Sequence, residues 1–172
     1  MIRVVVNDAS CLIDLNKVGL LPAMLTLPYR FIVPLPIRYS EMLDLTDEDW
    51  QRLDEYGLET FDLPGDLVAE VVRLAEETPG LSANDCFCLV SALHLHDSVL
   101  LTGDLRLRQV ARAAGLRVHG VLWIIHHLHA AGVCGVSRLA AALETWREDR
   151  TVFLPRKEID SRLRSMRGLA DQ

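Results

Sequence analysis

The stretch VVVNDASCLIDL, residues 4–15, decides the fold, because a strand pattern gives way to a helix pattern within a few residues. Ile2–Val6 is a largely β-branched apolar run, typical of a strand buried on both faces. After Asn7-Asp8, Ser10 is predicted to cap a helix that Gly19 ends. A buried strand followed at once by a helix is the first half of an α/β unit.

The same alternation continues along the chain. Four further strands are predicted at Arg30–Val33, Leu58–Leu63, Ser98–Thr102 and Arg117–Val121. Helices are expected over Ile37–Leu43, over Thr46–Tyr56, from Pro64 to Pro79-Gly80, from Ser82 onward, and over Leu105–Ala114. Thr46 with Asp49, and Ser82 with Asp85, have the spacing of a capping box. This order predicts an α/β fold with a mostly parallel sheet and helices on both of its faces.

A helical extension is expected after the sheet. Its helices are predicted near Leu122–Ala131, Ser137–Trp146 and Pro155–Met166. We therefore expect a single domain over residues 1–172, with a core of about 1–120 and a C-terminal extension of about 121–172.

Composition restricts the class of protein. Half of the 172 residues are apolar and the net charge is -6, so the surface as a whole does not attract polyanions. None of the four cysteines forms a CxxC pair, which favours buried free thiols. Residues 118–137 lack charged side chains, but their histidines and glycines argue against a membrane span. No signal peptide opens the sequence, so a cytoplasmic location is expected.

Four acidic residues occupy positions that this topology directs toward one crevice. Asp8 and Asp104 follow the carboxyl ends of two strands, where ligands bind in open parallel sheets. Asp85 lies in the first turn of an apolar helix, and Glu41 lies in the helix after the second strand. Each has a structural alternative: a helix cap for Asp104, a capping box for Asp85, a turn for Asp8 and a solvated surface for Glu41. Oxygen ligands of this kind favour Mg²⁺ or Mn²⁺ over zinc.

These residues lie in segments that resemble the PIN-domain ribonucleases, including the VapC-type toxins of toxin–antitoxin pairs. The segments are VVVNDASCLIDL around Asp8, PIRYSEML around Glu41, LSANDCFCLVSAL around Asp85 and LLTGDLRLRQVARAAGLRV around Asp104. The resemblance implies a three-layer α/β/α fold and metal-dependent hydrolysis of single-stranded RNA that leaves a 5′-phosphate. It also implies that the four acids bind Mg²⁺ or Mn²⁺ and that the hydroxyls of Ser10 and Thr102 support them.

Further expectations concern binding partners. HGVLWIIHHLHAAGV, residues 119–133, resembles a PIN subgroup with a longer C-terminal end that often lacks some of the acids, all four of which are present here. The resemblance implies a homodimer and a cognate antitoxin. The helix arginines Arg38, Arg106, Arg108 and Arg112 are candidates for phosphate contacts, with a solvated surface as the alternative. The histidines lack zinc spacing and are expected to be structural.

Other functions fit the sequence less well. A receiver-like signalling domain would need a lysine after a late strand, and Leu100–Asp104 contains none. A haloacid-dehalogenase-like phosphatase would need an aspartate where Ser10 stands, and no glycine-rich nucleotide motif is present. The remaining alternative keeps the fold without catalysis: an inactive PIN-like scaffold that binds RNA or a protein partner.

Overall fold

The computed structural model describes residues 3–41 and 45–170. Its sheet has five parallel strands in the order β3-β2-β1-β4-β5. The strands are β1 Arg3–Asn7, β2 Tyr29–Pro34, β3 Leu58–Phe61, β4 Ser98–Leu101 and β5 Arg117–His119. The predicted α/β architecture with a parallel sheet is confirmed, and the β-branched runs of β1 and β2 occupy its buried centre.

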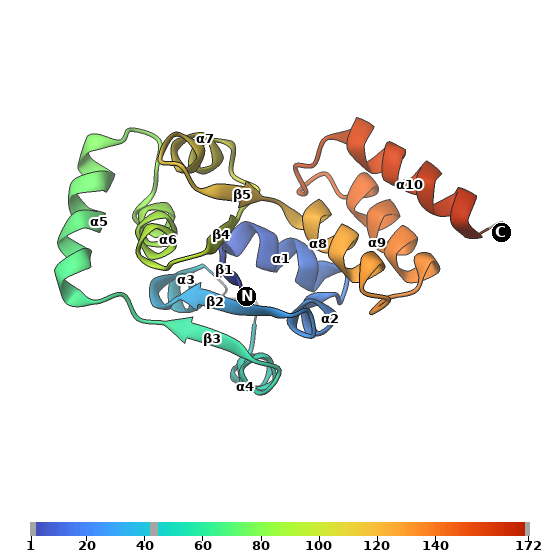
Figure 1. Cartoon of the computed structure of the whole chain (residues 1–172), viewed down its shortest axis with the longest axis horizontal. Coiled ribbons are helices and arrows are strands. Elements are labelled where there is room, and N and C mark those ends of the chain that lie inside the picture. The colour runs from blue at the N-terminus through green and yellow to red at the C-terminus, as the bar shows by residue number, and fades with distance from the viewer. Residues whose placement is uncertain (1–2, 42–44, 171–172) are drawn as a thin grey trace.

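Ten helices are described within these ranges. They are α1 Ala9–Lys17, α2 Leu21–Leu25, α3 Leu35–Ser40, α4 Asp47–Glu55, α5 Gly65–Glu77, α6 Ala83–His94, α7 Leu105–Ala113, α8 Val121–Ala130, α9 Val136–Glu148 and α10 Arg156–Ala170. Helix α6 packs across β1, β2 and β4 and is covered by α5, whereas α1, α2 and α8 pack together. Figure 1 shows α5 and α6 to the left of the sheet and α1 and α8 to its right, which gives a three-layer α/β/α arrangement.

Local sequence signals explain most element boundaries. Both predicted capping boxes form, Thr46 with Asp49 at α4 and Ser82 with Asp85 at α6. Gly19 has a φ of 64°, a conformation that glycine adopts without steric cost, and it follows the end of α1 as predicted. The acidic segment after Thr46 forms α4 and the edge strand β3, which pairs with β2.

Some details of the predicted elements differ from the structure. Asp8 rather than Ser10 is the N-cap residue of α1. Helix α3 ends at Ser40, so Glu41 is its C-cap residue, and the predicted end at Leu43 lies outside the described residues. Helix α2 was not predicted, because five residues are too few to show a helical repeat.

The C-terminal helices pack onto the N-terminal part of the chain. Helix α8 packs against α1 and α2, α9 against α8, and α10 against α9. Trp146 of α9 is only 1% exposed, and its indole Nε1 donates a hydrogen bond to the backbone oxygen of Asp14 in α1 at 2.8 Å. Among the described residues, no helix is both long and apolar enough to cross a membrane.

The buried contact of Trp146 predicts that the C-terminal helices stabilise the rest of the chain. Trp146→Ala should lower the free energy of unfolding by about 3–5 kcal/mol, because it removes a large buried side chain and leaves a cavity. Chemical denaturation followed by circular dichroism measures this change. The control is Phe153→Ala, which removes an 87% exposed ring and should change stability by no more than about 0.5 kcal/mol. A Trp146→Ala protein of unchanged stability would contradict the prediction.

Candidate active site

The site is centred on Asp8, the first residue after β1. Its side chain is withdrawn from water, with 4% of the residue exposed, and its backbone N–H donates to the oxygen of Leu101 in β4 at 3.0 Å. Parallel strands β1 and β4 are neighbours, so their carboxyl ends place Asp8 beside the loop that follows β4.

Two hydroxyl groups donate to the same oxygen of Asp8. Ser10 Oγ and Thr102 Oγ1 each lie 2.7 Å from Asp8 Oδ2. Ser10 Oγ also accepts from the Gly103 N–H at 2.9 Å, and Thr102 Oγ1 accepts from the Asp104 N–H at 3.1 Å. Since each hydroxyl has one proton and already accepts an N–H, both protons are directed at Asp8. The predicted supporting positions of Ser10 and Thr102 are therefore next to the carboxylate.

Burial and hydrogen bonding act on Asp8 in opposite directions. Burial raises the pKa of Asp8, and the hydrogen bonds from Ser10 and Thr102 lower it by a smaller amount. The charges of Asp85 and Glu41 raise this pKa further. Asp85 and Glu41 therefore lie close enough to Asp8 for their charges to act on it.

The same acids also affect the pKa of a buried cysteine, Cys88. Cys88 is completely buried in α6, and its Sγ lies 3.9 Å from the backbone oxygen of Asn7. Burial raises the pKa of Cys88 well above its ordinary value, and the charges of Asp8, Asp85 and Glu41 add to the increase. The predicted free, buried state of all four cysteines is confirmed.

Asp85 and Asp104 also have the structural roles that the sequence left open. Asp85 Oδ2 accepts from the Ser82 N–H at 2.7 Å within the capping box of α6. Asp104 Oδ1 accepts from the Leu107 N–H at 2.6 Å and caps α7. In each case the described hydrogen bond engages one carboxylate oxygen, which leaves the other oxygen available to a ligand.

Asn84 was not identified from the sequence. Its Nδ2 donates to Glu41 Oε1 at 2.7 Å and to Ser40 Oγ at 2.8 Å, so it joins the N-terminus of α6 to the C-terminus of α3. Glu41 itself is exposed and follows the end of its helix, and this amide holds its carboxylate. The available signal was a second polar residue directly before Asp85 in the LSANDCF segment.

The donor set has the chemistry of a hard divalent cation site. All four acids offer carboxylate oxygens, which Mg²⁺ and Mn²⁺ prefer, and a cation would offset both the burial that raises the pKa of Asp8 and the smaller repulsion from Asp85 and Glu41. Within residues 3–41 and 45–170, no three His, Cys, Asp or Glu side chains are grouped closely enough to hold a metal ion. The residues thus fit a metal by their donor atoms, and binding would require them to draw closer.

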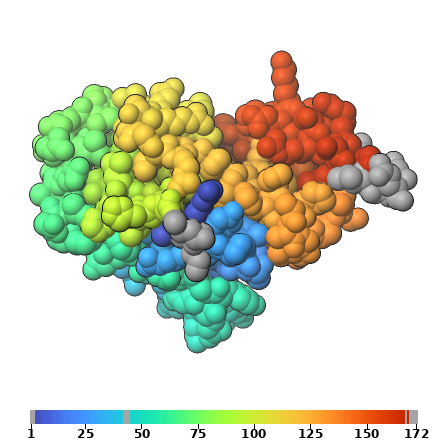
Figure 2. All heavy atoms as spheres, in the orientation of Figure 1, coloured from blue at the N-terminus to red at the C-terminus, as the bar shows by residue number. Residues whose placement is uncertain are grey.

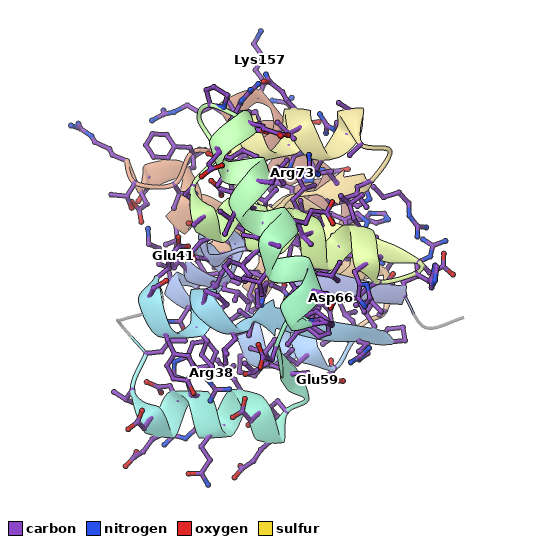
Figure 3. All side chains as sticks on the ribbon, turned by 90° about the vertical axis from the view of Figure 1, so that its left-hand side faces the viewer. Arg38, Glu41, Glu59, Asp66, Arg73 and Lys157 are labelled. Atoms are coloured by element: carbon purple, nitrogen blue, oxygen red, sulfur yellow. The ribbon has the colours of Figure 1, made fainter. Side chains whose placement is uncertain are left out.

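The predicted arginines have partners of different kinds. Arg38 forms two hydrogen bonds to Asp54, at 2.8 and 2.9 Å, and lies 4.5 Å over the ring of Trp50. Figure 3 shows Arg38 directed toward α4 and Glu41 on the other side of α3. Arg108 Nη1 donates to the Thr102 backbone oxygen at 2.8 Å, and Arg106 Nε donates to that of Pro79 at 3.2 Å. Arg106 and Arg112 remain exposed on α7.

Buried Asp8 predicts a pH-dependent stability. Because folding raises its pKa, the folded state loses stability relative to the unfolded state as the pH rises from the ordinary pKa through the raised one. Asp8→Asn should therefore raise the melting temperature at pH 7.5 without metal, and the gain should shrink toward pH 4. Thermal unfolding across this range in EDTA measures it.

The control is Asp49→Asn. Hydrogen bonds from Thr46 lower the pKa of Asp49, so this change should lower the melting temperature at pH 7.5. An Asp8→Asn protein that is less stable than the wild type at pH 7.5 would show that burial does not dominate at Asp8.

The comparisons with known proteins agree with this geometry. The family model DUF3368, described as a PIN domain, matches residues 4–167. A search of curated proteins finds no match. PIN domains are generally nucleases, and they typically use divalent metals. Since the matching model spans nearly the whole sequence, the chain belongs to the PIN-domain family.

Proposed function

We propose that this PIN domain is an Mg²⁺- or Mn²⁺-dependent endoribonuclease with Asp8, Glu41, Asp85 and Asp104 as its acidic residues. The observation that carries the proposal is the desolvated Asp8 carboxylate, which two oriented hydroxyls hold and which the charges of Asp85 and Glu41 reach. A carboxylate kept out of water among other acids destabilises the fold, and binding a divalent cation would offset that cost.

The chain's own groups would fix the reacting geometry. Ser10 and Thr102 orient Asp8 through Oδ2, and no described residue donates a hydrogen bond to Oδ1, which is left to face a ligand. Asn84 orients Glu41, and the capping interactions orient Asp85 and Asp104. A bound divalent ion supplies a Lewis acid for the phosphodiester and lowers the pKa of its water.

RNA is the proposed substrate because of the resemblance to the PIN-domain ribonucleases. A net charge of -6 disfavours broad binding of polyanions, so the phosphate would be recruited by bound cations together with exposed Arg106 and Arg112. Arg38 and Arg108 are less suited to that task, since both already bind groups of this chain.

The proposal extends to the biological setting. A VapC-type toxin role, with an antitoxin partner and a homodimer, follows from the resemblance of the four acidic segments. A cytoplasmic location accords with an RNA substrate. The alternative of an inactive scaffold that binds RNA or a protein would keep the fold and lack metal-dependent cleavage.

The first test is cleavage of a panel of single-stranded and structured RNAs by the purified chain. Cleavage should require Mn²⁺ or Mg²⁺, stop in EDTA, and fall on the order of 100-fold or more in Asp8→Asn, because a metal ligand is lost. Asp66→Asn on α5, an exposed aspartate labelled in Figure 3, serves as the control and should cleave normally. Cleavage that persists in Asp8→Asn would place the active site elsewhere, and its absence from the wild type would favour the scaffold.

A second test concerns Asn84. Asn84→Ala frees the Glu41 carboxylate, so the metal concentration that gives half-maximal cleavage should rise about 10-fold or more. Cleavage at saturating metal should be less affected than in Asp8→Asn. The control is Asn16→Ala, which removes an exposed asparagine of α1. An unchanged metal dependence in Asn84→Ala would show that Glu41 needs no support from this amide.

A further inference from the structure

A cavity opens directly beside the acidic site. It has a volume of about 550 Å³, and its lining includes Ser10, Gly103 and Asp104, which also build the site. A second cavity of about 410 Å³ adjoins it and shares Gly103, Leu105, Phe153 and Leu154. In Figure 2 a hollow separates the spheres of α7 from those of α10 at the upper edge of the molecule. The cavity therefore adjoins the proposed metal-binding acids on the side of Ser10 and Asp104.

Two large apolar side chains stand exposed in the lining of this cavity. Leu105, the first residue of α7, is 75% exposed, and Phe153, between α9 and α10, is 87% exposed. A single exposed apolar residue is common on a protein surface. Two from separate elements at one cavity next to a proposed active site instead form a surface on which a flat apolar group can lie.

The segment that presents Phe153 is held in place. Lys17 Nζ of α1 donates to Asp149 Oδ2 at 3.1 Å and to Thr151 Oγ1 at 2.6 Å. The Thr151 N–H in turn donates to Asp149 Oδ1 at 2.8 Å. These bonds tie the turn before Phe153 to α1, the helix that begins beside Asp8, so the backbone that carries the exposed ring is anchored next to the site.

Asp14 supplies a hydrogen-bond acceptor in the same lining. Asp14 is one of the residues that line the 550 Å³ cavity, and no described residue donates a hydrogen bond to its carboxylate. Burial raises the pKa of Asp14 to about 6, with Lys17 opposing the increase and Asp149 adding to it. The carboxyl is therefore mostly ionised at pH 8 and offers two acceptor oxygens in surroundings poor in water.

We propose, as an extension of the ribonuclease function, that this cavity binds one unstacked guanine base of single-stranded RNA next to the scissile phosphate. Phe153 and Leu105 contact the faces of the base, and Asp14 accepts hydrogen bonds from its Watson–Crick edge. Single-stranded RNA is commonly recognised in this way, by stacking on aromatic side chains and by hydrogen bonds to the base edge.

The acceptor chemistry of Asp14 selects guanine among the four bases. Guanine presents two neighbouring donors on that edge, N1–H and the N2 amino group, which match the two oxygens of a carboxylate. Adenine and cytosine place an acceptor nitrogen beside their amino group, and uracil offers one N–H between two carbonyl oxygens. Each of these three would put an acceptor against the Asp14 carboxylate, which is unfavourable.

Binding to labelled pentaribonucleotides tests the proposal independently of cleavage. The probes are UUGUU, UUAUU, UUCUU and UUUUU, and fluorescence anisotropy is measured with the Asp8→Asn chain in Mg²⁺ at pH 8. UUGUU should bind most tightly. Adding Phe153→Ala should weaken its binding about 10-fold, because one base loses its stacking partner. Adding Asp14→Asn should remove the preference for UUGUU over the other three probes.

Matched variants separate these effects from general damage. Tyr56→Ala removes another exposed aromatic ring, at the end of α4, and Asp66→Asn changes an exposed carboxylate of α5; Figure 1 places both helices away from α10. Neither should alter binding, and circular dichroism checks that every variant is folded. Equal binding of the four probes, or binding that Phe153→Ala and Asp14→Asn leave unchanged, would overturn the guanine site. Guanine-selective binding by a wild-type chain that cleaves no RNA would retain the base site and refute the ribonuclease proposal.

Discussion

The buried carboxylate of Asp8 is the constraint around which the active-site end of the sheet is arranged. Its Oδ2 receives the protons of Ser10 and Thr102, and these hydroxyls accept the N–H groups of Gly103 and Asp104. One network thus joins the end of β1, the start of α1 and the loop after β4. Because each hydroxyl is used both as donor and as acceptor, removing the Ser10 or the Thr102 hydroxyl leaves the N–H group that it accepts without its partner, at a cost of about 1–3 kcal/mol. The network therefore fixes where α1 and α7 begin.

Local sequence signals predicted the fold well where an element is long or capped. The apolar strands β1, β2 and β4, and the capping boxes of α4 and α6, depend on neighbouring residues alone and appear as predicted. Errors occur where a distant contact decides the outcome. Serine is a common N-cap residue, but the Ser10 hydroxyl donates to Asp8 and accepts from the N–H of Gly103, which lies 93 residues away in the loop after β4. These hydrogen bonds of Ser10 depend on the pairing of β1 with β4, which no short window of sequence contains.

The site was predictable in its residue types and only partly in its geometry. Strand order brings Asp85 and Glu41 within electrostatic reach of Asp8, and this follows from the topology. The topology does not determine how the carboxylates are held. Asp104 caps α7 and Asp85 completes the capping box of α6, so the structural alternatives weighed in the sequence are present, and the proposed metal-binding role would use the same side chains. Contacts between separate elements could not be predicted from the sequence. Asn84 of α6 binds Glu41 after α3, and Arg38 of α3 binds Asp54 of α4.

The distribution of charge explains how an acidic chain can suit an acidic substrate. The negative charges of the acids around Asp8 repel a phosphate as long as no cation is bound. A divalent cation reverses the sign of the local field, whereas the surface beyond about 10 Å is screened at moderate salt and adds little. Affinity would then depend less on arginines than in most RNA-binding proteins and more on contacts to the bases. Arg38 is paired with Asp54 and is therefore less available to bind a phosphate. The exposed Phe153 and Leu105 offer apolar contacts to a base instead. If the chain cleaves RNA as proposed, selectivity among RNAs would reside in the cavity beside the acids rather than in a basic surface.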